Sequence, residues 1–148
     1  MRNKFSRTQD ELILNAQNWA YKKIKEIGAT HALTLSFSTP FVDIERDEKD
    51  REHCKKILRY GMNNISKKIY GSHNQGVIKR FITIERGSYN KSFSLHAHAV
   101  VTNDTGLTNE EFNECVFNGW TKTKGAHKSA SMFSIEELYD TKGWSLYM

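Results

Sequence analysis

Two histidines, His96 and His98, lie two positions apart in the otherwise apolar segment of residues 93–101. In a β-strand the side chains alternate between two faces, so both imidazoles point one way while Ala97 and Ala99 point the other. The apolar face can be buried in a core, and the opposite face presents two imidazoles side by side. This geometry can bind one metal ion, although a pair of this kind can also be a partly exposed polar face.

A carboxylate on the preceding segment completes the candidate site. Residues 77–85 are predicted to form a strand, and residues 87–91 the hairpin turn that leads to the histidines. The alternation puts Glu85 on the histidine side, close to His96 across the hairpin. Two imidazoles and one carboxylate suit Mg²⁺, Mn²⁺ or a heavier divalent ion and leave open positions for water or substrate. The alternative is that Glu85 ends its strand in solvent or pairs with a basic neighbour.

The composition is that of an ordinary globular protein. The chain has 148 residues, of which 38% are hydrophobic and 26% charged, which suits one domain with a buried core. It contains no apolar run long enough for a membrane span and no apolar segment typical of a secretory signal, and its two cysteines form no metal-binding spacing. A reducing cytoplasm and no membrane partner are therefore expected. The net charge of +5 is compatible with nucleic-acid binding without predicting it.

Hydrophobic spacing and capping residues indicate the elements that must position the site. Helices are predicted over residues 7–27, 43–70 and 108–120, and strands over residues 30–38, 77–85, 93–102 and 130–135. The basic segment of residues 121–128 is predicted to be a mobile loop. This order favours a single α+β domain over residues 1–148. Its antiparallel sheet would have helices on one face and an open second face, close to ferredoxin-like and RNA-recognition folds.

The ordered set of motifs resembles the HUH endonucleases, which include rolling-circle replication initiators, relaxases and related transposases. The segment His96-Ala97-His98 matches their His-hydrophobic-His motif, and residues 32–38 are similar to an upstream strand in which apolar residues alternate with Thr or Ser. Glu85 falls where several initiators carry the acidic residue that completes the metal site. The resemblance covers the chain from about residue 30 to its end, and it implies an HUH nuclease fold with Mn²⁺ or Mg²⁺ at these three residues.

In this family a tyrosine on a helix after the sheet, followed three or four positions later by a lysine, supplies the nucleophile. Tyr139 and Lys142 fit this spacing literally, whereas residues 143–147 look more like the approach to the catalytic tyrosine in related initiators. The resemblance therefore favours Tyr147 by a narrow margin, with Tyr139 as the alternative. The lysine that accompanies Tyr147 would follow the last residue, so we expect this chain to be truncated at its C-terminus.

The resemblance implies metal-dependent nicking and transfer of single-stranded DNA through a 5′-phosphotyrosine intermediate, which initiates rolling-circle replication of a phage or plasmid. The implied partners are origin DNA, a helicase domain and host replication proteins. The expected location is the cytoplasm of a bacterial cell or of the host of a mobile element. Basic residues that flank the site are candidate contacts to the DNA backbone: Lys79, Arg80, Arg86, Lys91, Lys122 and Lys124.

Two other functions are compatible with the same pattern. A non-catalytic RNA-recognition-like module would place aromatic side chains on the open sheet face, whereas Thr34, Ser36 and Glu85 make the predicted face polar. A metal-dependent phosphoesterase that uses water as the nucleophile would need the same histidines but no tyrosine. Substitution of the tyrosines separates this second alternative from a strand transferase.

Overall fold

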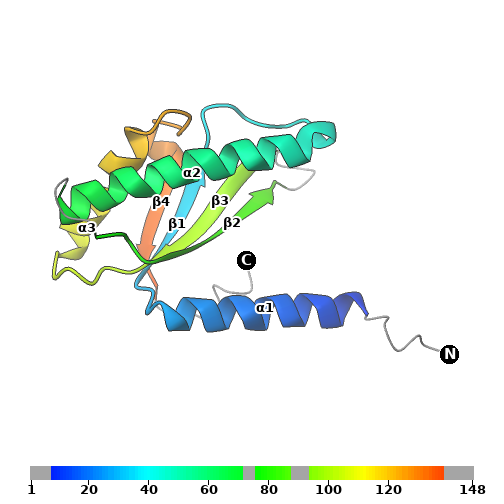
Figure 1. Cartoon of the computed structure of the whole chain (residues 1–148), viewed down its shortest axis with the longest axis horizontal. Coiled ribbons are helices and arrows are strands. Elements are labelled where there is room, and N and C mark those ends of the chain that lie inside the picture. The colour runs from blue at the N-terminus through cyan, green and yellow to red at the C-terminus, as the bar shows by residue number, and fades with distance from the viewer. Residues whose placement is uncertain (1–7, 72–75, 88–93, 139–148) are drawn as a thin grey trace.

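Four antiparallel strands and three α-helices make up the part of the chain that the structure describes. The computed structural model describes residues 8–71, 76–87 and 94–138. The elements are α1 (Gln9–Glu26), β1 (His31–Ser36), η1 (Ile44–Arg46), α2 (Asp47–Tyr70), β2 (Arg80–Arg86), β3 (Leu95–Val101), α3 (Asn109–Thr121), η3 (Ala130–Met132) and β4 (Phe133–Glu137). The strand order is β2-β3-β1-β4 (Figure 1). Each crossover, β1-α2-β2 and β3-α3-β4, therefore skips one strand, which is the ferredoxin-like arrangement. The α+β prediction is confirmed.

Two Thr-x-x-Glu sequences fix where α1 and α3 begin. The Thr8 hydroxyl accepts a hydrogen bond from the Glu11 N–H at 3.1 Å, and the Thr108 hydroxyl accepts one from Glu111 at 3.2 Å. In both cases the glutamate side chain returns to the backbone N–H of the threonine, so each helix has a complete capping box. Both caps were predictable because the interaction is confined to four consecutive residues.

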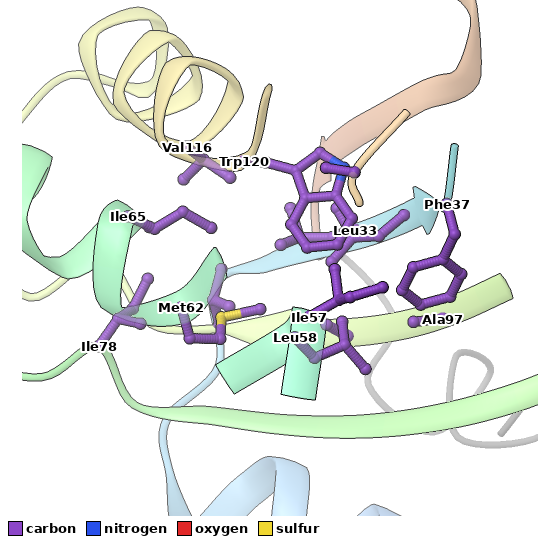
Figure 2. Packing of buried hydrophobic residues seen from close by; sticks show 14 of the residues in the cluster. Leu33, Phe37, Ile57, Leu58, Met62, Ile65, Ile78, Ala97, Val116 and Trp120 are labelled. Atoms are coloured by element: carbon purple, nitrogen blue, oxygen red, sulfur yellow. The ribbon is translucent and has the colours of Figure 1, made fainter. Parts of the chain in front are cut away.

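One face of the sheet is covered by α2 and α3. Met62 and Ile65 of α2 pack with Val116 and Trp120 of α3 over Leu33 of β1, and all five side chains are buried (Figure 2). The alanines that alternate with the two histidines face the same core. Burial of this face fixes the direction in which the alternate residues of β3 point, and it therefore aims both histidines at the opposite face.

The second face is only partly open, because α1 covers one end of it. Ile24 is buried against Ala32 of β1 and Val100 of β3, and the Trp19 ring meets Phe81 of β2 edge-on at 5.2 Å. Figure 1 shows α1 at the end of the sheet where β1 begins and β4 ends. The prediction that helices cover only one face was therefore wrong. None of the helices in the described part of the chain is long and apolar enough to cross a membrane.

The basic segment after α3 packs against the protein, so the prediction of a mobile loop does not fit. Ala126 forms an antiparallel bridge with Phe37, and both side chains are buried in the core. The Ser38 N–H donates to the Gly125 carbonyl at 2.8 Å, and the His127 N–H donates to the Ser36 carbonyl at 2.9 Å. This segment therefore extends the sheet beside the end of β1, beyond the point where β4 stops pairing.

Candidate metal centre

The strand register divides the second face of the sheet into three rows of side chains. From the end covered by α1 outward, the rows are Phe81, Val100 and Ala32; then Thr83, His98 and Thr34; then Glu85, His96 and Ser36. Successive rows are two residues apart along each strand, which is about 7 Å. The face thus changes from apolar to polar to metal-ligating over a short distance.

Glu85, His96 and His98 meet at the open end of this face. The Glu85 Oε2 atom lies 3.3 Å from His98 Nε2 and 3.8 Å from His96 Nε2. The two imidazole centroids are 4.9 Å apart, and the ring planes are nearly perpendicular at 87°. Glu85 and His96 are direct cross-strand neighbours, while His98 stands in the adjacent row. The structure therefore brings together the three residues that the sequence pattern grouped.

The spacing of these groups fits a metal ion. Metal–ligand bonds of about 2.1 Å place neighbouring ligand atoms roughly 3.0–3.4 Å apart. The Glu85–His98 separation of 3.3 Å lies in this range, and the Glu85–His96 separation of 3.8 Å requires only a small side-chain rotation. The three side chains keep between 19% and 31% of their exposure, so water or substrate can reach them. The cluster could hold a metal ion.

The neighbours of His98 favour its metal-binding form. The Thr34 hydroxyl lies 3.4 Å from His98 Nδ1, which leaves Nε2 on the side of Glu85. The pKa of His98 lies below its ordinary value. Burial is the main cause, the Glu85 carboxylate opposes it, and the neighbouring His96 lowers the pKa further. The neutral imidazole that a metal requires is therefore favoured. Thr34 was placed on this face by its strand alternation, but only the register opposite His98 reveals that it orients a ligand.

A second threonine beside the cluster has an unused hydroxyl. Thr83 lies directly opposite His98, and its Oγ1 atom is buried without a hydrogen-bond partner among the described residues. Buried polar groups are nearly always paired, and an exception next to a ligand set is the kind of group that a hydrated ion satisfies. This observation supports the same location for a metal.

The basic residues predicted around the site lie in different places. Lys122 and Lys124 line a cavity of about 510 Å³ together with Ser38, which continues β1 past Ser36 at the open end of the sheet. Lys79 precedes β2 at the opposite end of that strand, roughly 20 Å from Glu85 at about 3.3 Å per residue. Among the described candidates, Lys122 and Lys124 therefore lie toward the same end of the sheet as the cluster, whereas Lys79 lies at the other end.

Arg80 and Arg86 face the helices, and the prediction that they flank the metal site was wrong. Arg86 Nη2 lies 2.6 Å from Asp47 Oδ1 and its Nη1 donates to the Phe41 carbonyl at 2.7 Å. The Arg86 guanidinium is the largest factor that lowers the pKa of Asp47. Arg80 lines a separate cavity between β2 and α2. The alternation that puts Glu85 beside the histidines sends its even-numbered neighbours to the other face.

The remaining predicted residues, Tyr139, Lys142, Tyr147 and Lys91, lie outside the described part of the chain. Comparisons with protein-family models, curated protein sequences and solved structures found no match. The site itself therefore carries the functional argument.

Proposed function

We propose that this protein is a metal-dependent enzyme that nicks and transfers single-stranded DNA. The observation that carries the proposal is the convergence of Glu85, His96 and His98 at the uncovered end of an antiparallel sheet. The same three residues belong to the set of motifs on which the resemblance to HUH endonucleases rests. The activity we propose initiates rolling-circle replication of a phage or plasmid, in the cytoplasm of a bacterial cell or of the host of a mobile element.

The ligand set favours Mn²⁺, with Mg²⁺ as the second choice. Mg²⁺ prefers oxygen ligands, whereas two of the three groups here are imidazoles, which suit softer divalent ions. When bound, such an ion supplies positive charge that polarises the scissile phosphate. The Thr34 hydroxyl holds the orientation of His98, and the Glu85 carboxylate balances the charge of the ion.

The nucleophile in this proposal is the phenolic oxygen of Tyr147 or Tyr139. As its bond to phosphorus forms, the phenol loses its proton and the bond between phosphorus and the 3′ oxygen breaks. The 3′ oxygen takes up a proton and leaves as a hydroxyl, so that the 5′ phosphate stays on the enzyme. A later 3′ hydroxyl can reverse the step, because the phosphodiester bond is conserved in the adduct.

The composition of the open face favours chemistry over passive binding. An RNA-recognition module needs aromatic side chains free to stack on bases. Phe81 stands on this face, but it packs against the apolar cluster that contains Ile24 and meets the Trp19 ring edge-on. The two rows beyond Phe81 consist of threonine, serine, histidine and glutamate. This arrangement offers ligands and hydrogen bonds to a phosphodiester, and these two rows contain no phenylalanine, tyrosine or tryptophan on which a base could stack.

The test is a search for a covalent protein–DNA adduct. The protein is incubated with labelled single-stranded oligonucleotides and Mn²⁺, and the products are separated under denaturing conditions. We expect an adduct that His96→Ala abolishes and that one of Tyr147→Phe and Tyr139→Phe abolishes. The exposed His53 of α2 supplies a matched control, because His53→Ala removes an imidazole on the other side of the sheet.

Two results would overturn the strand-transfer proposal. Cleaved DNA that forms without an adduct in both tyrosine variants would indicate a phosphoesterase that uses water. Isothermal titration that detects no difference in Mn²⁺ binding between the unsubstituted protein and His96→Ala would show that the cluster is not a metal site.

A further inference from the structure

The row that contains Glu85 and His96 continues across the sheet to His127. Ser36 lies next to His96 in the register of β1 and β3, and its carbonyl accepts the His127 N–H at 2.9 Å on its other side. The neighbouring bridge pairs Phe37 with Ala126. Both of these side chains enter the core, so the alternation places Ser36 and His127 on the metal-binding face. Two strand spacings separate the α-carbons of His96 and His127, which is roughly 10 Å.

The His127 ring offers a hydrogen-bond donor. Its Nδ1 atom accepts the Ser129 N–H at 3.2 Å. A neutral imidazole that accepts at Nδ1 carries its proton at Nε2, which can donate to an anion. No other hydrogen bond of this ring is formed within the described residues, and the side chain is half-buried. His127 therefore presents a fixed ring with one donor available.

The segment around His127 forms a basic cavity. The cavity has a volume of about 510 Å³ and is lined by Ser38, Lys122, Lys124, Gly125, Ala126, His127 and Lys128. None of these residues is acidic. Lys128 Nζ donates to the Thr121 carbonyl at 2.6 Å, whereas neither Lys122 nor Lys124 forms an ion pair with any described residue. A concave surface with one sign of charge concentrates ligands of the opposite sign.

The cavity is preformed because its walls are anchored in the core. Thr123 is buried, accepts a hydrogen bond from Asn64 Nδ2 at 3.0 Å and donates to the Gly119 carbonyl at 3.0 Å. Gly125 has a φ of 92°, and a Cβ at this position would lie 2.7 Å from Ile57 Cδ1. The segment thus rests closely on α2, and little ordering is required when an anion binds.

We infer that Lys122, Lys124 and His127 form a second phosphate subsite for the same nucleic-acid strand. The inference rests on the proposed function, and it defines the substrate as a polynucleotide. The α-carbons of His96 and His127 are roughly 10 Å apart and their side chains share one face, a spacing that suits two phosphates of one polynucleotide rather than a single phosphate group. The strand would cross β3 and β1, with one phosphate at the metal cluster and another in the basic cavity. A small phosphate ester would occupy only the first.

The test measures binding of a fluorescent single-stranded oligonucleotide by anisotropy at several salt concentrations. We expect the double variant Lys122→Gln, Lys124→Gln to bind about tenfold more weakly. The slope of log affinity against log salt should decrease by about 0.7 for each phosphate that the protein no longer neutralises. The matched control is Lys22→Gln, Lys25→Gln, which removes the same charge from exposed positions of α1. Equal weakening and equal slopes in the two double variants would overturn the subsite.

His127 is tested with a pair of substitutions. His127→Phe removes the donor, whereas His127→Gln keeps a donor and an acceptor of similar reach. We expect weaker oligonucleotide binding in the first and recovery in the second, with melting temperatures that show both variants to be folded. If His127→Phe and His127→Gln both bind the oligonucleotide as tightly as the unsubstituted protein does, His127 is not part of the subsite.

The outcome can be separated from that of the proposed function. Unlabelled polynucleotide should displace the probe, and a mononucleotide at the same phosphate concentration should not. If no covalent adduct forms but the Lys122→Gln, Lys124→Gln variant binds the oligonucleotide more weakly, the phosphate subsite is supported and the strand-transfer proposal is contradicted. An adduct that forms with unchanged affinity and salt slope in the lysine variant overturns the subsite alone.

Discussion

The two ends of one sheet face have opposite properties. At one end Ala32, Val100 and Phe81 form an apolar row that Ile24 and Trp19 of α1 cover. At the other end, four positions along the same three strands, the row of Glu85, His96 and Ser36 is left uncovered by any described helix. The register therefore builds a closed structural end and an open ligand-bearing end from the same strands.

The difference between the two ends follows from the cost of burying polar groups. Full burial of a large apolar side chain such as Ile24 contributes about 1.5–3 kcal/mol. Imidazoles and a carboxylate in the same position would each lose hydration that a helix could not replace. The helix that closes the apolar row thus leaves the metal-ligating row accessible, and stability and chemistry depend on different residues.

The largest expected effect is a loss of stability when a buried side chain of the closed end is shortened. Ile24 has no exposed surface, so Ile24→Ala should lower the free energy of unfolding by about 2–5 kcal/mol. His96→Ala at the open end should change it by less than about 1 kcal/mol, because that side chain is partly hydrated. Urea unfolding of both variants without added metal measures the contrast. Similar losses in the two variants would contradict the division of the face.

A smaller loss of stability is expected from the ion pair behind the metal cluster. Arg86 adjoins Glu85 but points to the helix side, where its side chain is 12% exposed and bonded to Asp47 and Phe41. Arg86→Met should cost about 1–3 kcal/mol and leave Mn²⁺ and oligonucleotide affinity unchanged. Arg80→Met is the control, since Arg80 makes one longer bond, to the Ile78 carbonyl at 3.3 Å. Loss of Mn²⁺ binding in Arg86→Met would show that the two faces are coupled.

The contrast between Glu85 and Arg86 shows how far sequence reasoning reaches. Alternation along one hairpin predicts that Glu85 joins the histidines, and the same alternation, applied to Arg86, would have removed it from the DNA contacts. Local patterns also predict the caps at Thr8 and Thr108. They do not predict that α1 returns to cover Ala32 and Val100, since this depends on which face the other helices leave free.

The basic segment after α3 illustrates a second limit. Its lysines and glycine are typical of a solvated loop, yet Ala126 pairs with Phe37, far away in the sequence. Pairing at such separation depends on the completed sheet, so no local pattern contains it. For the same reason the sequence gives His127 no feature beyond those of an ordinary loop residue, and its place in the row of His96 emerges only from the register.

The next prediction concerns a buried histidine at the start of β1, which points to the face covered by α3 and should make stability depend on pH. His31 is 2% exposed, its Nε2 lies 3.1 Å from Asn109 Oδ1, and its ring packs on Phe112. Burial lowers its pKa below 6.5, more than the Asn109 hydrogen bond and the Glu137 charge raise it. The unfolded chain therefore takes up more protons than the folded protein below pH 6.5.

The contribution of His31 to stability is consequently complete above pH 6.5 and is lost as the pH falls through the lowered folded-state pKa. The free energy of unfolding should fall by at most about 1.4 kcal/mol per pH unit on this account. Urea midpoints between pH 7 and 5 should decline less in His31→Gln than in the unsubstituted protein. The exposed His53 is the control, and His53→Gln should retain the full decline. Parallel curves for the two variants would rule out His31 as the source.

The smallest expected effect concerns the middle row, between the two ends, where two threonines flank His98. Thr34 Oγ1 lies within hydrogen-bonding distance of His98 Nδ1, whereas Thr83 Oγ1 is buried without a partner among the described residues. Valine has nearly the shape of threonine, so each substitution removes only the hydroxyl. Thr83→Val should raise the free energy of unfolding by about 1 kcal/mol in the absence of metal, because a buried unpaired hydroxyl is costly. Thr34→Val should be neutral or destabilising, because it removes a bond to the imidazole.

Opposite signs at two positions of the same row would show that the protein keeps an unpaired polar group beside the metal ligands at the expense of stability. The Thr83 hydroxyl would then serve the metal ligands of the open end, although it is buried like the side chains of the closed end. Urea unfolding with chelator present resolves a difference of this size. A loss of stability in Thr83→Val would mean that its hydroxyl is already satisfied in the metal-free protein, and the boundary of the ligand-bearing region would then lie at His98 itself.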